Sequence, residues 1–133
     1  MPAEELFVES IDHLLSTAKA ALESKHHVFV FFSGSTDLKT GDSWSIDCQK
    51  AEPVLEDCLK RSKDGDVFIM IEVGSESEWT SPDNRFRTHP VFQLKNIPTV
   101  VSLRLVGDEL SVADRIECSS CHNKDALEKL FNV

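Results

Sequence analysis

The sequence predicts an α/β fold, a mixed central sheet covered by helices on both faces. Two apolar runs rich in β-branched and aromatic residues, Val28–Phe32 and Val67–Val73, are typical of strands buried on both faces. Segments with helical periodicity precede, separate and follow these runs, which requires crossover connections and a parallel portion of the sheet. Two later strands, Thr99–Val106 and Ser111–Cys118, are separated by a short Gly-Asp turn and should form an antiparallel pair.

Two long helices are expected in the first half of the chain. Ser10 is suited to cap the first one, because apolar residues then recur three or four positions apart at Ile11, Leu14, Leu15, Ala18 and Leu22. The second helix should begin at Ser45 and run to about Ser62, with Pro53 inside it as the expected source of a kink.

The remaining segments are predicted to be a loop and two shorter helices. Ser33–Ser43 is polar and contains two glycines, so we expect a surface loop there. Pro82–Arg87 fits the first turns of a short helix, with Ser81 as its cap. Asn123 is expected to cap a last helix, whose inner face would carry Ala126, Leu127, Leu130 and Phe131.

Length and charge restrict the possible functions. The 133 residues amount to about one domain, so residues 1–133 are expected to fold as a single unit. Lys and Arg number 14 against 23 Asp and Glu, a net charge of -9 that argues against nucleic-acid binding. No run of about 18 apolar residues is present, and the N-terminus lacks a basic stretch followed by an apolar one. We therefore expect a cytoplasmic chain that does not enter membranes.

The segment Ser43–Cys48 carries the most chemical information, and it reads S-W-S-I-D-C. A thiol-disulfide enzyme would carry W-C-x-x-C at the start of a helix, where unpaired N–H groups and the helix dipole stabilise a thiolate. Here Trp44 and the second cysteine, Cys48, are present, but Ser45 occupies the first cysteine position. Serine caps a helix well, yet without an adjacent base its hydroxyl is not a nucleophile.

The surrounding motifs resemble the thioredoxin domain-containing protein 17 (Clot) family, which has a thioredoxin-like fold. The run F-F-S-G-S-T-D-L-K-T-G-D-S-W-S-I-D-C-Q-K-A-E-P is similar to that family's F-x-G-S-x-D loop followed by S-W-C-x-D-C-x-x-A-E-P. Further matches are V-G from Val73, W-x-x-P-x-N-x-F-R from Trp79, and I-P-T from Ile97. The resemblance covers roughly residues 28 to 105 strongly, and the two ends only by the order of elements.

The resemblance implies a cytosolic dithiol-disulfide oxidoreductase that acts on small disulfides or selected proteins and is recycled by thioredoxin reductase. In such a protein the first cysteine attacks and the second resolves the mixed disulfide, so Cys48 takes the resolving position and Ser45 replaces the nucleophile. Ile46 departs from the family's proline, which favours natural divergence over a single replaced cysteine, whereas Asp47 keeps the family's acidic residue. We expect these two residues to tune the site, and we expect no resident cofactor or metal.

Three more residues are assigned to the site by the resemblance. Ile97 and Pro98 match the position where thioredoxin-like folds place a cis proline beside the active site, and the backbone before it would pair with extended substrate. Trp44 is either an aromatic shield over the site or a platform for substrate, and the sequence leaves both open. Val30 lies near the buried aspartate of ordinary thioredoxins, so their proton route should not be assumed here.

Two cysteine groups leave alternatives open. Cys48 is either a partly buried, unreactive thiol or a single-thiol site that forms one mixed disulfide and is released by an external thiol. Cys118-Ser-Ser-Cys121-His122 matches a haem-attachment motif, half of a zinc site or a redox pair. We favour two ordinary cysteines there, remote from Ser45.

Two functions remain in competition at the sequence level. The first is a Clot-like oxidoreductase for disulfide-containing small molecules or proteins, with its dithiol cycle impaired and any residual activity passing through Cys48. The alternative is a catalytically inactive thioredoxin-like module that binds extended peptides or partner proteins. A third and weaker hypothesis places redox chemistry at Cys118 and Cys121.

Overall fold

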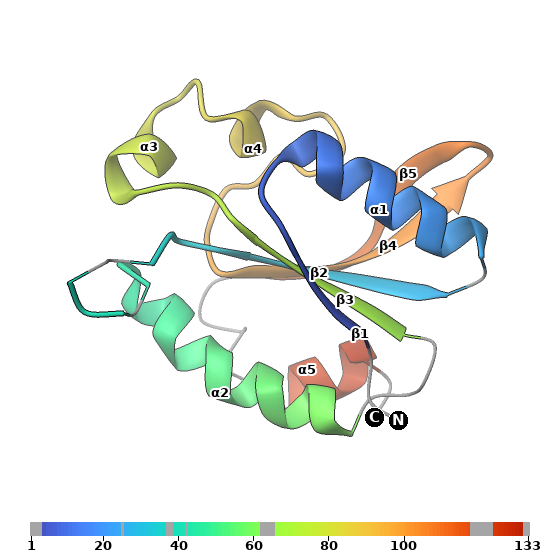
Figure 1. Cartoon of the computed structure of the whole chain (residues 1–133), viewed down its shortest axis with the longest axis horizontal. Coiled ribbons are helices and arrows are strands. Elements are labelled where there is room, and N and C mark those ends of the chain that lie inside the picture. The colour runs from blue at the N-terminus through green and yellow to red at the C-terminus, as the bar shows by residue number, and fades with distance from the viewer. Residues whose placement is uncertain are drawn as a thin grey trace.

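A computed structural model describes residues 4–24, 26–36, 39–41, 43–61, 66–117 and 124–131 (Figure 1). The strands within these residues are β1 (Glu4–Val8), β2 (His27–Ser33), β3 (Asp66–Glu72), β4 (Thr99–Val106) and β5 (Glu109–Glu117). The helices are α1 (Ile11–Glu23), α2 (Ile46–Lys60), α3 (Glu76–Thr80), α4 (Arg85–Thr88) and α5 (Lys124–Phe131). None of the described helices is long and apolar enough to cross a membrane.

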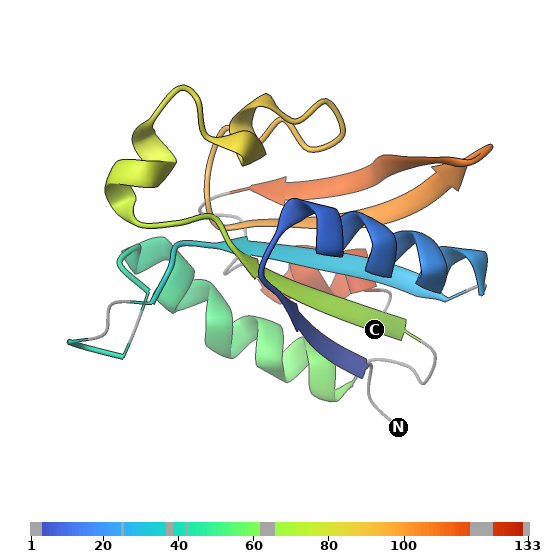
Figure 2. The ribbon, with the colours of Figure 1, turned by 45° about the horizontal axis from the view of Figure 1, so that its top comes forward.

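The strands form one mixed sheet in the order β1-β3-β2-β4-β5. β1, β3 and β2 run parallel, whereas β4 is antiparallel to both β2 and β5 (Figure 2). Phe32 near the end of β2 pairs with Thr99 at the start of β4. The carboxyl end of the central strand therefore lies beside the segment that enters β4, which determines where the candidate site forms.

Helices cover both faces of the sheet, as predicted. α1 lies on one face and α2 and α5 lie on the other (Figures 1 and 2). β2 supplies both cores, because successive side chains of a strand point to opposite faces. Phe29 and Phe31 pack with α2 and α5, while Val28, Val30 and Phe32 pack on the α1 side. This double burial confirms that the run is a central strand, and it confirms Val30 as an apolar core residue, 0% exposed.

Most predicted elements are confirmed, including both long helices and their caps. The Ser10 side chain accepts from the backbone N–H of His13 at 3.1 Å, and Ser45 caps α2. α2 continues through Pro53 to Lys60. β4 has the predicted bounds, and β5 starts two residues earlier than predicted. The expected cap Asn123 and the C-x-x-C-H residues Cys118, Cys121 and His122 lie outside the described residues, as does Ser62.

Strand β1 is absent from the prediction. It has five residues, begins with two glutamates and buries only Val8 fully, so its sequence carries little strand signal. It is held by parallel pairing with β3, from Glu4 opposite Val67 to Val8 opposite Ile71. Long-range pairing therefore determines this element, whereas local preference does not.

The prediction of one short helix capped by Ser81 is wrong, because two helices form. Ser75 starts α3 through a capping box: its hydroxyl accepts from the N–H of Glu78 at 3.3 Å, and the Glu78 carboxylate accepts from the N–H of Ser75 at 3.0 Å. Ser81 then ends α3, and Asn84 caps α4 by accepting from the N–H of Phe86 at 2.9 Å. The S-x-x-E signature of a capping box was present in the sequence at Ser75–Glu78. It determines where the first of the two helices starts, and Ser81-Pro82 starts neither.

The core on the α2 side depends on Phe31, which is 0% exposed and stacks on Phe68 with ring centroids 6.5 Å apart. We predict that Phe31→Ala lowers the free energy of unfolding by about 3–5 kcal/mol, because it removes buried area and leaves a cavity. Urea denaturation followed by circular dichroism measures this change. Phe7→Ala is the matched control, since Phe7 is 58% exposed and its truncation should leave the unfolding midpoint nearly unchanged.

Candidate functional site

The site is built around the N-terminus of α2. Ser45 has an extended conformation, and its hydroxyl accepts from the backbone N–H of Cys48 at 3.4 Å. This N-cap contact satisfies one of the donors that every helix start leaves unpaired. The Ser45 N–H in turn donates to the hydroxyl of Ser43 at 3.3 Å. The prediction that Ser45 is a helix cap is confirmed.

Cys48 lies one turn inside the helix and is 0% exposed. Its sulfur accepts from the backbone N–H of Gly34 at 3.5 Å. The carbonyl of Gly34 accepts from the hydroxyl of Ser43 at 2.9 Å, so the same glycine ties the thiol and the residue before Trp44 together. The expected surface loop is therefore wrong at its ends, where Ser33 and Ser43 are 7% and 4% exposed: Ser33 is the last residue of β2, and Ser43 is held by its hydrogen bond to Gly34.

Trp44 is half-buried and packs against the core on the α1 side. Its indole N–H donates to the carbonyl of Gly74 at 2.8 Å, which also accepts from the N–H of Ser35 at 3.0 Å. A Cβ at Gly34 would lie 2.7 Å from Cε2 of Trp44, closer than real contacts allow. The indole therefore needs glycine at position 34, which explains the glycine directly after a buried strand.

Gly34 and Gly74 were not among the predicted site residues. A signal for Gly34 existed, since glycine after a strand often marks a close approach of another group. Gly74 has φ +113, and its neighbour Glu78 leaves no space for a side chain, because a Cβ would lie 2.9 Å from that of Glu78. Neither contact follows from local sequence, since Trp44 reaches Gly74 across 30 positions.

The Ile97–Pro98 peptide bond is cis, as predicted. Both residues are buried, and they directly precede Thr99, which pairs with Phe32. Pro98 therefore lies close to the end of β2, next to Ser33 and Gly34, and Gly34 is the residue that contacts Ser43 and Cys48. Ile97 and Cys48 also belong to one core cluster. The structure thus brings Trp44, Ser45, Cys48, Ile97 and Pro98 to the same end of the sheet.

The two residues predicted to tune the site occupy different environments. Ile46 is 63% exposed, one of the large hydrophobic residues that the described surface presents. Asp47 is half-buried in the first turn of α2, where a carboxylate interacts favourably with the positive end of the helix dipole. An apolar side chain and an acidic one therefore follow Ser45 in the first turn of α2.

The segment after β3 holds the surroundings of Gly74 in place through hydrogen bonds and ring packing. The Asn84 side-chain amide donates to the carbonyls of Val73 and Glu78, each at 3.1 Å. Trp79 is 6% exposed, and the guanidinium of Arg87 lies 4.0 Å from its ring centroid and donates to its carbonyl at 2.6 Å. Phe86 packs edge-on against Phe32, with ring centroids 6.0 Å apart. Trp79 and Phe86 are confirmed as packing residues.

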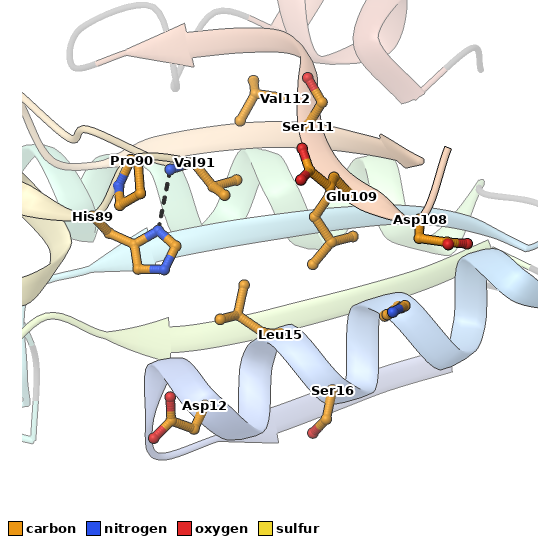
Figure 3. Close-up of a pocket in the computed structure, with 12 residues that line it drawn as sticks. Asp12, Leu15, Ser16, His89, Pro90, Val91, Asp108, Glu109, Ser111 and Val112 are labelled. Carbon is orange, nitrogen blue, oxygen red and sulfur yellow. Dashed lines mark hydrogen bonds between the residues drawn. The ribbon is translucent and has the colours of Figure 1, made fainter. Parts of the chain in front are cut away.

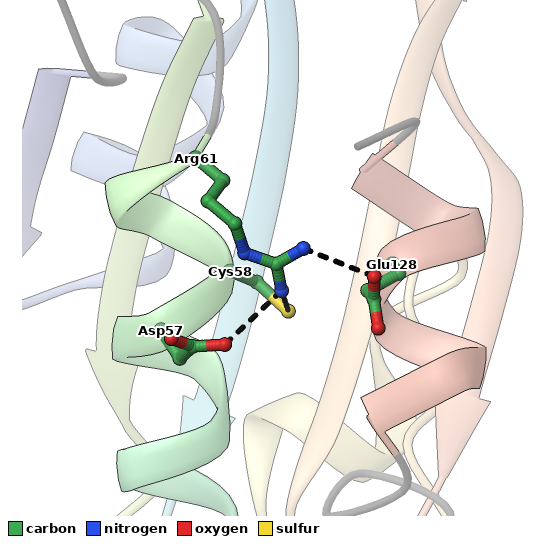
Figure 4. A network of polar contacts seen from close by, with 4 residues as sticks. All are labelled: Asp57, Cys58, Arg61 and Glu128. Atoms are coloured by element: carbon green, nitrogen blue, oxygen red, sulfur yellow. Dashed lines mark hydrogen bonds and ion pairs between the residues drawn. The ribbon is translucent and has the colours of Figure 1, made fainter.

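The other described thiol, Cys58, lies in α2 ten positions after Cys48 and belongs to a separate network of polar contacts (Figure 4). The Arg61 guanidinium donates to Glu128 at 3.0 Å and to Asp57 at 3.1 Å, and lies 3.8 Å from the Cys58 sulfur. The hydrogen bond with Glu128 raises the pKa of Arg61. This network joins α2 to α5 and plays a packing role away from Ser45.

The arrangement has clear chemical limits. Thiol-disulfide exchange begins with attack by an accessible thiolate, and the accessible position holds the hydroxyl of Ser45, which is engaged as a cap. Cys48 has sulfur but no exposure. Among the described residues, no group of three His, Cys, Asp or Glu could hold a metal ion. The site therefore offers a half-buried indole, a capped helix start and a buried thiol.

We predict that Gly34→Ala displaces Trp44 and breaks its hydrogen bond to Gly74. The indole N–H signal of Trp44 should shift in a ¹H–¹⁵N spectrum, and its hydrogen exchange should accelerate. Gly41→Ala is the control in the same loop: alanine is strained at its φ of +78, but nothing lies within 4 Å of the added Cβ, so the Trp44 indole signal should stay in place. An unchanged indole signal in Gly34→Ala would contradict the packing described for Trp44.

We predict that Ser45→Ala lowers the free energy of unfolding by about 1 kcal/mol through loss of the N-cap, whereas Ser45→Asn restores most of it. Denaturant unfolding of the three proteins measures the difference. Ser77→Ala controls for a serine elsewhere on the surface, within the first turn of α3. Equal stability of Ser45→Ala and the unaltered chain would show that the hydroxyl does not cap α2.

Comparisons with known proteins agree with this geometry. A family model described as thioredoxin domain-containing protein 17-like, thioredoxin domain, matches residues 7–133. Thioredoxin domain-containing protein 17 of Homo sapiens is 32% identical over 105 residues, 79% of this chain and 77% of its own. The thioredoxin-like protein Clot of Arabidopsis thaliana is 34% identical over 94 residues, 71% of this chain and 67% of its own.

Solved structures show the same fold. The thioredoxin NaTrxh from Nicotiana alata superposes with a TM-score of 0.63 at 19% identity, covering 97% of this chain and 90% of that one. The chain therefore belongs to the thioredoxin domain-containing protein 17-like family of thioredoxin-fold proteins.

Proposed function

We propose that this chain is a thioredoxin-related binding module that holds extended polypeptide segments, including those of disulfide-bearing partners, without running a two-thiol cycle. The observation that carries the proposal is the pair at the start of α2: a serine cap at the nucleophile position and a Cys48 that is 0% exposed. Between the two functions considered from the sequence, this geometry favours the binding module over the oxidoreductase.

The burial of Cys48 supports the binding module over the oxidoreductase. A thiolate must approach a disulfide sulfur directly, so a sulfur with no accessible surface cannot reach one on another molecule. In the dithiol mechanism the buried second thiol acts on a mixed disulfide already formed by the first. With Ser45 in that place no such intermediate forms beside Cys48, and a disulfide in a bound partner stays intact.

The surface that remains suits recognition of extended chain. Trp44 is half-buried, Ile97 and Pro98 are buried at the same end of the sheet, and in the family it is the backbone before the cis proline that pairs with substrate backbone. Ile46 adds an exposed apolar side chain at the rim, 63% accessible. Main-chain pairing supplies affinity, and neighbouring apolar side chains supply selectivity.

The proposal also concerns partners and location. Thioredoxin reductase would have no disulfide to reduce at Ser45 and Cys48, so it is not required as a recycling partner for this site. Disulfide-containing small molecules and proteins remain as binding partners. We propose a cytoplasmic location, where the buried thiol of Cys48 would stay reduced.

A second candidate, single-thiol chemistry at Cys48, is favoured by one contact. The Gly34 N–H points at the sulfur from 3.5 Å, an arrangement able to support charge on it. Local opening of the α2 N-terminus would expose the thiolate, which would attack a partner disulfide and expel one of its sulfurs as thiolate. A small-molecule thiol would then release Cys48 and regenerate it.

Insulin reduction coupled to NADPH separates the two candidates when it is run with thioredoxin reductase and, in parallel, with glutathione and glutathione reductase, because the single-thiol route needs a small-molecule thiol to release Cys48. We predict NADPH consumption at the blank rate for the unaltered chain, and at least roughly tenfold more for Ser45→Cys, which supplies the attacking thiol. The double variant Ser45→Cys/Cys48→Ala is the matched control and should lose steady turnover, because the mixed disulfide is no longer resolved.

Activity of the unaltered chain that Cys48→Ala abolishes would overturn the proposal in favour of the single-thiol candidate. Binding is measured separately by titrating insulin with its disulfide bonds intact into the ¹⁵N-labelled chain. The Trp44 indole and Ile97 amide signals should shift, and absence of any shift there would contradict the binding role.

A further inference from the structure

One face of the sheet lacks a full covering layer. On the α2 face, α5 packs beside α2 and contacts β5. On the opposite face α1 packs on β2, β3 and β4. α3 and α4, with five and four residues, lie at one end of the sheet (Figures 1 and 2). The space beside α1 over β5 is therefore not filled by a long helix of the described chain.

A groove of about 730 Å³ occupies this space, bounded by α1, the segment 89–91 and the start of β5 (Figure 3). Its apolar lining comes from Leu15, Val91, Leu110 and Val112. All four are only partly buried, and all pack against the core cluster on the α1 side. The apolar core thus reaches the surface along the groove, which is typical of an interaction site. None of the predicted site residues lines it.

The rim of the groove is acidic. Asp12, Asp108 and Glu109 line it with Lys19 as the single basic residue. Arg85 lies 3.7 Å from Asp12, and both side chains are exposed, 66% and 83%; Arg85 and Lys19 together offset two of the three carboxylate charges, so the rim keeps an excess of negative charge. Carboxylates stand at both ends, on α1 and on the turn between β4 and β5.

His89 does not offset this charge. Its Nδ1 accepts from the N–H of Val91 at 3.2 Å, and its ring lies 5.1 Å from that of Phe92. Burial, followed by the nearby charge of Arg85, lowers the pKa of His89 below its ordinary value. The ring is therefore neutral at neutral pH, and the groove remains an apolar channel with excess negative charge.

We propose that this groove docks an amphipathic helix of a partner protein, with an apolar face flanked by Lys or Arg. A helix completes the missing layer, because a sheet face buries its apolar residues against packed helices. Asp12 and Lys19 lie about two turns apart on α1, so a partner helix of roughly two to three turns spans the groove. A second copy of this chain is a poor occupant, since each copy carries a net charge of -9.

Three synthetic peptides of ~15 residues test the proposal on the ¹⁵N-labelled full chain, a length at which isolated helices become marginally stable. The first has a Leu stripe flanked by Lys, the second carries Glu in place of Lys, and the third is a scramble of the first without a stripe. We predict saturable amide shifts at Leu15, Val91, Leu110 and Val112 with the first peptide, and affinity at least roughly tenfold weaker for the other two.

Paired variants locate the binding site. Glu109→Lys reverses a charge on the rim and should weaken binding of the basic peptide roughly fivefold. Asp114→Lys is the matched control, because Asp114 is exposed on the same strand and does not line the groove; it should retain the affinity. Both residues are exposed, so neither variant should disturb folding.

Four results would overturn the proposal. They are no shifts with the basic peptide up to about 1 mM, shifts confined to the surroundings of Trp44, equal binding of the acidic peptide, and equal weakening by the two charge reversals. Concentration-dependent shifts without peptide would assign the groove to a second copy instead. Saturable binding of a small apolar dye that the basic peptide fails to displace would assign it to a small molecule.

Discussion

The packing of Trp44 against Gly34 is the contact on which the rest of the site depends. With a hydrogen atom as its side chain, Gly34 lets the indole approach and donate to Gly74 at 2.8 Å. The same glycine donates its N–H to Cys48 and accepts from Ser43. One residue at the end of β2 thereby fixes the loop, the start of α2 and the segment that leads to α3. A side chain there would displace all three.

Ser45 keeps this architecture in place as the N-cap of α2. Its hydroxyl satisfies a donor of α2 as a cap, so the helix keeps its start without a thiolate. Cys48 stays in the core as a small apolar residue whose sulfur accepts one N–H. This end of the sheet thus combines a capped helix start with a buried thiol, beside the buried Ile97 and Pro98.

Local patterns made the centre of the fold predictable. Val28–Phe32 and Val67–Val73 are continuous apolar runs, and Ser10 and Ser45 precede helical periodicity, so strands, helices and caps followed from the sequence. β1 did not, because its strand state comes from pairing with β3. The burial of Ser43 and the reach of Trp44 to Gly74 did not either, since both depend on tertiary contacts across many positions. The groove beside α1 lies where the chain has only the short helices α3 and α4, of five and four residues.

The described site presents no accessible thiol, because Cys48 is 0% exposed. This is tested by the rate of alkylation of Cys48 by iodoacetamide in the native chain, followed by mass spectrometry of the modified peptide and compared with the urea-unfolded chain. We predict that Cys48 is labelled at least roughly a hundredfold more slowly when folded, because labelling of a buried group requires opening of the structure. Labelling at the unfolded rate, together with a mixed disulfide to added oxidised glutathione, would contradict it.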